Sequence, residues 1–581
     1  MLGSRRARTG VGLVALCAIA LVVAASVGAG GAGATQNSAA ALPRSQTLYT
    51  TGTNWGPYNN LNPFMNWTYV TGTVGLVYET LFRYDPLKDT FIPWLASNGK
   101  WTGKTTYVAT VRPGVTWSDG TPFTAADVKF TIDKLKIPAH PQHTLWATGL
   151  RSVTTAGNKV TFAFGARPNY QEFDNYLFNV PIVPQHVWKS YPNNAIVSGN
   201  VNDVKKLVGT GPYTYHSGIN SQQSFTWQKR DGWWATKALG MDVKPQYIVD
   251  IFNGSNAASL ANLLAGKLDI SNNFVPGINK QVGSKIQTYF SGKPYMLAGN
   301  TAWLFPNTTR KPLDDPAFRK ALAHSINVDR IVTADYGNIV TKANPTGLLP
   351  IWDKYIDKAA VKQLGFSYNV AKAKSLLARA GYKDTDGDGF VEKKDGSELD
   401  LSIIVPNGWS DWMTAIQIIA DSAKGAGIKI TPSFPDYNTL VDDRGNGRYD
   451  LVIANDRQVS NTPWTYYDYI YRLPILKNQT TVNYQRYSNR AAWALTQQLD
   501  KTPTSNQAAM KSILSKLQRM FLRDLPVIPL WYNGVWAQWN TTNWANWPSS
   551  QNHQVLPAMW RNYLQMTGIE LLTGLKPKAA G

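Results

Sequence analysis

Residues 105–135 read TTYVATVRPGVTWSDGTPFTAADVKFTIDKL, and this stretch decides the class of fold. Residues alternate in polarity from Thr105 to Val111, which predicts a half-buried β-strand. Thr124-Ala125-Ala126-Asp127 has the pattern of a helix cap, and apolar residues then recur at helical spacing. A strand, a turn and a capped helix in direct succession indicate a mixed α/β chain.

Further along the chain, the same kinds of pattern alternate. Apolar residues recur at helical spacing over 315–331 and 371–380, and Gly381 ends the second of these predicted helices. Residues 403–405 and 451–453 read as buried strands, and loops containing tryptophan follow both. Ligands of open α/β sheets collect at the carboxyl ends of strands, so these loops are candidates for binding.

Composition excludes several classes of protein. The 581 residues are 43% hydrophobic and 16% charged, which fits a large folded core and excludes disorder, collagen and a membrane bundle. One cysteine excludes a disulfide scaffold and a zinc site built from several thiolates. The 22 Trp, 28 Tyr and 19 Phe exceed what a core needs, and indicate a flat, partly apolar ligand.

The amino-terminal residues predict export. Three arginines precede an apolar run from Val11 to Val27, and Ala32-Gly33-Ala34 then supplies a cleavage pattern. We therefore expect a signal peptide over 1–34, followed by a flexible segment over 35–44. The apolar run could also span a bilayer as an uncleaved anchor, and the sequence leaves this alternative open.

The formal net charge is +21, and removing residues 1–34 would leave the chain strongly basic. Nucleic acid is not the expected partner, because lysine and arginine are dispersed and do not form a basic arm. An exported basic protein more simply lies near anionic polymers of the cell envelope.

The sequence contains near-matches to catalytic motifs, but none of them is complete in its expected context. Gly28, Gly30 and Gly33 match GxGxxG but lie inside the predicted signal. Residues 99–105 suggest a phosphate-binding loop, yet the spacing of the two glycines is too short, so we expect a hairpin there. Paired carboxylates that meet in space leave a glycosidase open as an alternative. The prediction is that the protein is not an enzyme.

A series of short motifs follows a recognisable order. The segments are Tyr78-Glu79-Thr80-Leu81, Arg112-Pro113-Gly114 on to Asp127-Val128, Gly209-Thr210-Gly211-Pro212-Tyr213, Lys229 to Trp234, Leu264 to Ile270, Pro312 to Ile331, and Ala373 to Tyr382. In this order they resemble the family 5 extracytoplasmic solute-binding proteins of ABC importers. The resemblance covers essentially the whole mature chain, and no single motif has to carry it.

The resemblance implies a periplasmic-binding-protein-like fold of two α/β lobes, with a hinge and an additional domain. The first lobe would take residues 45–84, 206–300 and 531–581, the additional domain 85–205, and the second lobe 301–530. The implied mechanism is capture between open lobes, closure, and delivery to the membrane permease subunits of an ABC importer. The binding component would act as a monomer, and ATP would be hydrolysed on other chains.

Four segments resemble the cellobiose-binding branch of this family: Thr53 to Pro57, Ala343 to Gly347, Ser460 to Trp464, and Leu530 to Gly534. The oligopeptide-binding branch is the alternative. By resemblance, peptide binders hold the amino terminus of the ligand with an Asp shortly before a Pro; here Val459, Ser460 and Asn461 precede Pro463, although Asp456 is near. The predicted ligand is a β-gluco-oligosaccharide such as cellobiose or a cello-oligosaccharide. A peptide is the alternative, and a secreted glycosidase is a third, more distant possibility.

A β-linked glucose unit offers a flat apolar face to an indole and a rim of hydroxyls to amides. Burying on the order of 100 Å² per indole at about 25 cal/mol per Å² gives roughly 2.5 kcal/mol. Core packing is the alternative role for the tryptophans, and turn formation for the asparagines. The candidate ligand-binding residues are Asn54, Trp55, Trp409, Trp412, Asn461, Trp464, Trp531, Asn533 and Trp536.

Residues 384–395 form a separate motif, DTDGDGFVEKKD, whose spacing is that of a calcium loop. Position twelve is Asp and not Glu, and the Glu at position nine could compensate for its shorter arm. We expect a structural Ca²⁺ here, with an acidic turn as the alternative, and no cofactor for the function itself. The candidate ligands are Asp384, Asp386, Asp388, Phe390, Glu392 and Asp395, of which Phe390 would use its carbonyl.

Overall fold

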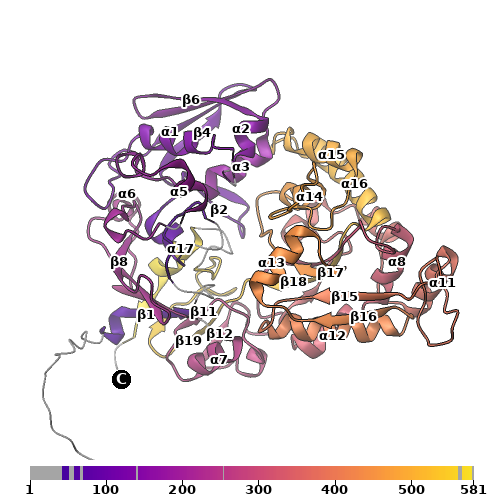
Figure 1. Cartoon of the computed structure of the whole chain (residues 1–581). Coiled ribbons are helices and arrows are strands. Elements are labelled where there is room, and N and C mark those ends of the chain that lie inside the picture. The colour runs from indigo at the N-terminus through magenta and orange to yellow at the C-terminus, as the bar shows by residue number, and fades with distance from the viewer. Residues whose placement is uncertain are drawn as a thin grey trace, which may run out of the picture. The chain divides into compact units, whose positions relative to one another are not determined.

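The computed structural model describes residues 42–51, 58–65, 70–138, 140, 142–199, 201–252, 254–559 and 566–578. The predicted signal peptide and most of the segment 35–44 lie outside the described residues. Three sheets of four or more strands organise the described part, and Figure 1 shows that their strands come from widely separated parts of the sequence.

The seven-stranded sheet combines the beginning, the middle and the end of the chain. Its strand order is β12-β19-β11-β1-β10-β9-β8. The central strand β1 pairs in parallel with both β10 and β11, and α7 (Asn256–Leu264) connects these two. The bounds are β1 (Thr47–Thr51), β8 (Tyr213–Ser217), β9 (Ser224–Lys229), β10 (Tyr247–Ile251), β11 (Ile270–Ser271), β12 (Ile286–Thr288) and β19 (Gln538–Asn540). Two further helices belong to this part, α6 (Trp234–Leu239) and α17 (Thr567–Gly574).

The six-stranded sheet has the order β14-β18-β13-β17-β15-β16. Its strands are β13 (Ala298–Pro306), β14 (Thr341–Lys342), β15 (Asp400–Ile404), β16 (Lys429–Ser433), β17 (Leu451–Ala454) and β18 (Ile528–Gly534). β15 runs parallel to β16 and β17, through the connecting helices α12 (Ser410–Lys424) and α13 (Tyr437–Asn446). The other helices here are α8 (Pro316–Ser325), α9 (Val328–Arg330), α10 (Lys358–Leu364), α11 (Val370–Ala380), α14 (Trp464–Tyr471), α15 (Arg490–Asp500) and α16 (Gln507–Asp524).

An antiparallel four-stranded sheet, β4-β5-β7-β6, is formed by the part of the chain that connects β1 to β8 of the seven-stranded sheet. Its strands are β4 (Ala96–Trp101), β5 (Thr106–Val111), β6 (Leu150–Ala156) and β7 (Lys159–Phe164). The helices of this part are α1 (Ala125–Lys134), α2 (Thr144–Thr148), α3 (Tyr170–Asn179), α4 (Gln185–Trp188) and α5 (Asn193–Ser198). Two short ladders complete the fold, β2 (Phe82–Asp85) with β3 (Thr90–Pro93), and β20 (Trp544–Ala545) with β21 (Lys576–Pro577).

The opening stretch of sequence is confirmed in detail: residues 106–111 form β5, and Thr124 with Asp127 makes the reciprocal capping box of α1. The hairpin expected over 99–105 is also present, as β4 turning into β5. The helix expected over 315–331 is shorter, because α8 ends at Ser325 and the extended residue Ile326 interrupts it before α9.

Glycine is required where the Gly209-Thr210-Gly211 segment crosses the chain at residues 76–77. A Cβ on Gly209 would lie 2.2 Å from the carbonyl oxygen of Val77, and one on Gly211 would lie 2.3 Å from that of Leu76. Backbone atoms cannot move aside as a flexible side chain can, so both positions exclude a larger residue. This close approach explains the motif in physical terms.

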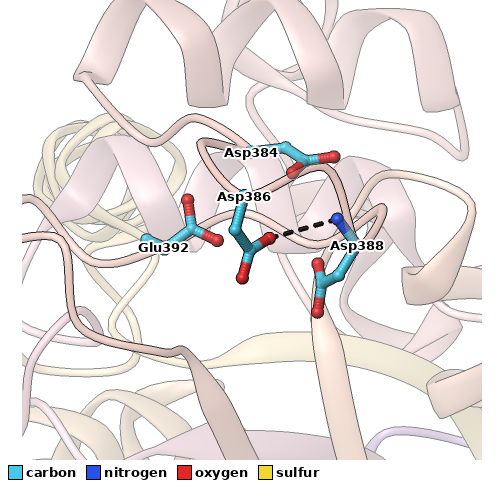
Figure 2. Close-up of side chains that lie close together, drawn as sticks. All are labelled: Asp384, Asp386, Asp388 and Glu392. Atoms are coloured by element: carbon cyan, nitrogen blue, oxygen red, sulfur yellow. Dashed lines mark hydrogen bonds between the residues drawn. The ribbon is translucent and has the colours of Figure 1, made fainter.

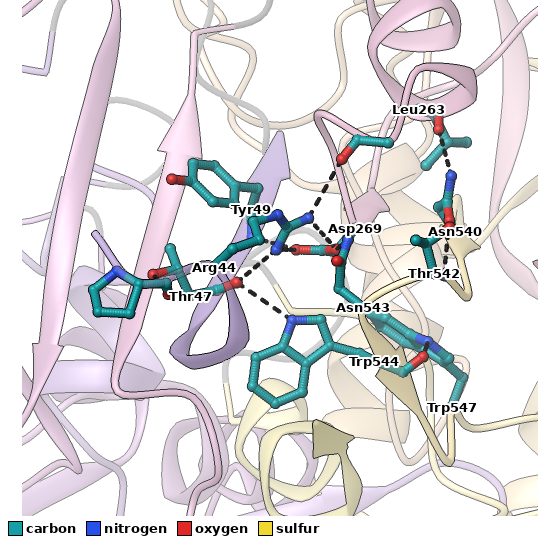
Figure 3. Close-up of polar contacts among 12 residues, drawn as sticks. Arg44, Thr47, Tyr49, Leu263, Asp269, Asn540, Thr542, Asn543, Trp544 and Trp547 are labelled. Atoms are coloured by element: carbon teal, nitrogen blue, oxygen red, sulfur yellow. Dashed lines mark hydrogen bonds and ion pairs between the residues drawn. The ribbon is translucent and has the colours of Figure 1, made fainter. Parts of the chain in front are cut away.

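Asp269 ties the start of the described chain to the seven-stranded sheet (Figure 3). Its fully buried carboxylate accepts hydrogen bonds from the Arg44 guanidinium at 2.6 Å, the Tyr49 backbone N–H at 2.8 Å and the Asn543 amide at 3.3 Å. Burial raises the pKa of Asp269, and these three contacts oppose that shift. One carboxylate therefore joins three distant segments of the chain.

The chain passes twice between the two larger sheets, through residues 289–297 and again through 535–537. One hydrophobic core runs through the four-stranded and seven-stranded sheets. The other fills the six-stranded part and also takes in Phe274 and Ile278, which follow β11. The second core thus continues across the junction between the larger sheets.

Candidate functional site

Several of the candidate residues follow the carboxyl ends of parallel strands. In the seven-stranded sheet, β1 and β11 end side by side at Thr51 and Ser271. Asn272 continues from β11, whereas Asn54 and Trp55, which continue from β1, lie outside the described residues. In the six-stranded sheet, parallel β15 and β17 lead respectively to residues 405–412 and 455–464. Each sheet therefore presents its loops at the edge where α/β proteins bind ligands.

Four rings form an aromatic cluster at the junction: Phe274, Tyr336, Trp531 and Trp536. Tyr336 lies 5.3 Å from Trp531 between ring centroids, and it is nearly parallel to Trp536 at 6.2 Å and 6°. Phe274 meets the Trp536 ring at 5.4 Å. Trp531 is fully buried in β18, and its indole N–H donates to Asn533 at 3.3 Å. The aromatic cluster thus spans the passage from β18 to β19.

Two acidic side chains adjoin the aromatic cluster. The Tyr336 hydroxyl donates to the buried Asp411 carboxylate at 3.2 Å. Burial raises the pKa of Asp411 to about 6. Burial, followed by the Asp411 charge, raises the pKa of Asp335 to about 8. Both carboxyl groups therefore take up protons much closer to neutral pH than an exposed Asp does.

Trp409 and Trp412 form a second aromatic group at the start of α12. Their rings lie 4.9 Å apart in an edge-to-face arrangement. Trp412 is buried, but Trp409 is partly exposed and stacks on Tyr437 at 5.8 Å, and Tyr437 is itself 50% exposed. Among the predicted tryptophans that the structure describes, Trp409 is the one whose ring remains open to a ligand without rearrangement.

The loop over 460–464 meets the four-stranded part of the molecule. The Thr462 hydroxyl donates to the Gln171 side chain of α3 at 2.5 Å, and the Asn461 amide donates to Asp174 at 3.4 Å. Trp464 is buried at the start of α14. Asn461 therefore lies in a contact between α3 and the six-stranded part, and a ligand would have to share that contact.

Buried carboxyl groups surround the same contact. The backbone N–H of Glu172 donates to Asp500 of α15 at 2.9 Å. Burial raises the pKa of both carboxyl groups, and that of Asp174 to about 7. Arg472 opposes the shift at Glu172 and also pairs with Asp468 at 2.7 Å. This contact is consequently more stable with some of its acids protonated.

The structure thus brings the predicted residues together in three groups. Trp531, Asn533 and Trp536 lie at the aromatic cluster, Trp409 and Trp412 at the start of α12, and Asn461 and Trp464 beside α3. Sequence reasoning missed Phe274, Tyr336, Asp335, Asp411 and the amide pair Asn272-Asn273. Two adjacent amides directly after a buried strand were a usable signal for the last of these.

Four carboxylates of the calcium-like loop converge (Figure 2). One oxygen each of Asp384, Asp386, Asp388 and Glu392 lies within 4.8 Å of the others. The Asp395 carboxylate instead accepts hydrogen bonds from the N–H and hydroxyl of Ser397 at 3.1 and 2.7 Å. The donor set of carboxylate oxygens suits Ca²⁺, with position nine in place of position twelve.

An open hollow of about 680 Å³ lies elsewhere, over α1 in the four-stranded part. Lys129, Phe130 and Lys136 contribute to its lining, and both lysines form ion pairs with Asp133. The hollow contains none of the predicted ligand-binding residues.

Comparison with protein families gives a match over residues 90–474 to the model "Bacterial extracellular solute-binding proteins, family 5 Middle". Among curated proteins, the probable peptide-binding protein YejA of Agrobacterium fabrum is 23% identical, with 84% of each chain covered. The oligopeptide-binding protein AppA of Bacillus subtilis is 24% identical, with 80% of this chain and 82% of AppA covered.

Solved structures extend the comparison. A mannohexaose-bound periplasmic oligopeptide-binding protein of an oligopeptide ABC transporter from Thermotoga maritima is 38% identical, with a TM-score of 0.87 over 93% of this chain and all of the other. The AppA structure of Bacillus subtilis in complex with a nonapeptide is 20% identical, with a TM-score of 0.72 over 92% of this chain and 99% of AppA. These likenesses confirm the two-lobed periplasmic-binding-protein fold.

Within the described part of the chain, no helix has the length and apolar character needed to cross a membrane. The family match covers well over half of the sequence, and the strongly similar solved structure covers nearly all of it. The chain belongs to the bacterial extracellular solute-binding proteins of family 5.

Proposed function

We propose that this protein captures a neutral β-gluco-oligosaccharide, such as cellobiose or a cello-oligosaccharide, for import. Family 5 proteins are extracytoplasmic substrate-binding components of ABC transporters and not enzymes, and this chain has that general role. The observation that carries the choice of a sugar is the partly exposed Trp409, which stacks on Tyr437 and lies two residues from Asp411, the hydrogen-bond partner of Tyr336 in the buried aromatic cluster. The 38% identity to a protein solved with mannohexaose supports it.

The contacts of Asp456 also favour a neutral ligand. A peptide's amino terminus needs a carboxylate partner, and Asp456 is the nearest one before Pro463 in the sequence. Its carboxylate is already engaged by Arg444 at 3.2 Å and by the Tyr484 hydroxyl at 2.6 Å. A carboxylate whose charge is already paired with an arginine of the same fold attracts an incoming ammonium group only weakly.

A peptide remains the second candidate, because the curated relatives YejA and AppA are named as peptide-binding proteins. Asp335 and Asp411 are the carboxyl groups that such a ligand could use at the junction. The pKa of Asp335, raised to about 8, disfavours a negative charge on that group at neutral pH and favours a hydroxyl-bearing ligand beside it, whereas Asp411, with a pKa of about 6, stays mostly ionised and is held by the Tyr336 hydroxyl.

The proposed cycle is closure of the two lobes on the sugar and delivery of the closed monomer to the permease subunits. The passages 289–297 and 535–537 would act as the hinge, and the contact between α3 and the loop 460–464 would form on closure. Predicted lobe boundaries at residues 84, 205, 300 and 530 remain part of this proposal.

The loop 384–395 is proposed to hold a structural Ca²⁺. The convergence of four carboxylates supports this role, and they lie in a segment that carries none of the proposed stacking residues. The ion would stabilise the connection between α11 and β15 and take no part in sugar binding.

Calorimetry on the mature protein tests the proposed ligand. Cellobiose, cello-oligosaccharides, laminaribiose, mannohexaose and a defined peptide mixture are titrated in parallel. Saturable binding of a glucan oligosaccharide, with the peptide mixture inactive, is the expected result. Tight binding of peptides without any response to sugar would assign the chain to the peptide branch instead, and the appearance of shorter sugars during the titration would indicate a glycosidase.

A further inference from the structure

Where β11 leaves the seven-stranded sheet, three buried amide side chains carry polar atoms without a hydrogen-bond partner among the described residues. The atoms are Asn272 Oδ1, Asn273 Nδ2 and Gln538 Oε1. The exposed fractions of these residues are 1%, 5% and 0%. Buried amide groups are almost always paired, because an unpaired one forfeits its hydrogen bonds to water.

In two of these side chains, hydrogen bonds donated by the amide nitrogen fix the orientation of the amide. Asn272 Nδ2 donates to the Trp536 carbonyl at 2.7 Å, which leaves Oδ1 as the unpaired acceptor. Gln538 Nε2 donates to the carbonyls of Ser271 and Asn273 at 2.7 and 2.9 Å. The acceptor atoms therefore cannot be exchanged with the donors by a simple flip.

Position links these amides to the aromatic cluster. Asn272 is hydrogen-bonded to the backbone carbonyl of Trp536. Phe274, two residues further on, contacts the rings of both Trp536 and Tyr336. Buried polar atoms thus adjoin buried rings at the edge where β1 and β11 end. Amides and rings in this arrangement are complementary to a ligand that is flat and apolar on its faces and polar at its rim.

We propose that Asn272 and Asn273, positioned by Gln538, form the hydroxyl-binding wall of the ligand site. A hydroxyl can donate to Asn272 Oδ1 and accept from Asn273 Nδ2, so sugar hydroxyls satisfy both. A carboxylate accepts only and would leave Oδ1 unpaired, and an ammonium donates only and would leave Nδ2 unpaired. The inference rests on the proposed function, because it names the residues that select a neutral polyol at that site.

Asn273→Ala is the principal test, because its Nδ2 has no hydrogen-bond partner to lose among the described residues. We expect the dissociation constants for cellobiose and mannohexaose to rise by roughly tenfold or more, with the melting temperature unchanged or slightly higher. Asn273→Asp, which replaces the donor by an acceptor of the same shape, should weaken binding at least as much. Asn272→Ala should also weaken binding, but it additionally loses the bond to Trp536.

Asn540→Ala is the matched control. Asn540 is buried in the neighbouring strand, and both ends of its amide are paired, with the Leu263 carbonyl and the Thr542 N–H, each at 2.9 Å (Figure 3). This variant should melt at a lower temperature and bind both sugars within about twofold of the parent, because it removes structural bonds alone.

Monodeoxy analogues of cellobiose show whether the contact is direct. In the parent, removing the hydroxyl that meets Asn273 weakens binding, and in Asn273→Ala the same removal should have little further effect. If the parent binds sugar and both Asn273 variants bind it equally well, the inference is overturned while the proposed function stands. If the parent binds none of the glucan oligosaccharides, the proposed function falls and the inference falls with it.

Discussion

Glu79 places a fully buried carboxylate between two indole N–H groups. Trp94 donates to one of its oxygens at 2.9 Å, and Trp234 donates to the other at 2.8 Å. Burial raises the pKa of Glu79, and the indole bonds oppose that shift. In the sequence, the segment 78–81 is recognised only as a motif of the family. In the structure, its Glu79 links the four-stranded part to α6 through hydrogen bonds.

Replacing Glu79 tests this link. Glu79→Ala leaves two buried indole N–H groups without an acceptor. We therefore expect the free energy of unfolding to fall by about 2–4 kcal/mol. Glu79→Gln keeps one acceptor and should lose less. Chemical denaturation measures both, and the exposed Glu398→Ala serves as the control. Equal stability of Glu79→Ala and the parent would show that the carboxylate contributes nothing net.

At the scale of elements, α3 meets the six-stranded part through acids whose pKa values are raised. The pKa of Asp174 is raised to about 7 from an ordinary value of 3.8 because burial disfavours its charge. An acid with a raised pKa in the folded state stabilises the fold fully below its unfolded pKa. That contribution is lost as the pH rises through the folded pKa.

Asp174→Asn should therefore flatten part of the pH dependence. We expect the parent's melting temperature to fall between about pH 4 and pH 7 on account of this group, and the fall to be smaller in the variant. Glu172, Asp500, Asp468 and Arg472 remain in both proteins, so the difference isolates Asp174. The exposed Asp231→Asn is the control, and identical pH profiles for Asp174→Asn and the parent would contradict the prediction.

The calcium-like loop gives a second prediction at this scale. If Ca²⁺ binds the folded state alone, a concentration of about one hundred times the dissociation constant adds about 2.7 kcal/mol of stability. Added Ca²⁺ should raise the melting temperature, and EDTA should reverse the rise. Asp386→Ala should abolish the response.

Asp395→Asn is the sharper comparison for the loop, because the Asp395 carboxylate is bonded to Ser397 and lies outside the convergent group. This variant should keep the response to calcium. Melting that is indifferent to Ca²⁺ in metal-free protein would reduce the loop to an acidic turn, and loss of sugar binding with the metal would contradict its separation from the ligand site.

The sequence predicts local elements of the fold, but it does not predict the long-range contacts between them. Strand β5, the capping box of α1 and the glycine stop of α11 follow from local spacing, and all are present. The grouping of Phe274, Tyr336 and Trp536 depends on long-range register between sheets, which no local pattern encodes. Trp531 illustrates the difference: its place in the sequence predicts a stacking platform, but its full burial in β18 gives it neighbours in the core.

For the whole molecule, the net charge of +21 makes salt a useful probe of the ligand. A neutral sugar forms no ion pair with the protein, so its dissociation constant should change by less than about twofold between low and high salt. A charged peptide held by carboxylates should weaken as salt rises. Calorimetry at two concentrations of sodium chloride separates these outcomes, and a steep salt dependence would contradict a neutral ligand.

The order of strands in the two larger sheets also governs how the chain can be made. β18 lies between β14 and β13, and β19 lies between β12 and β11, so both sheets are interrupted until residues 528–540 have been added. A ribosome has then already synthesised more than nine-tenths of the polypeptide. Neither of the two larger sheets can therefore complete its strand order before residues 528–540 are made, so we expect both lobes to finish folding late.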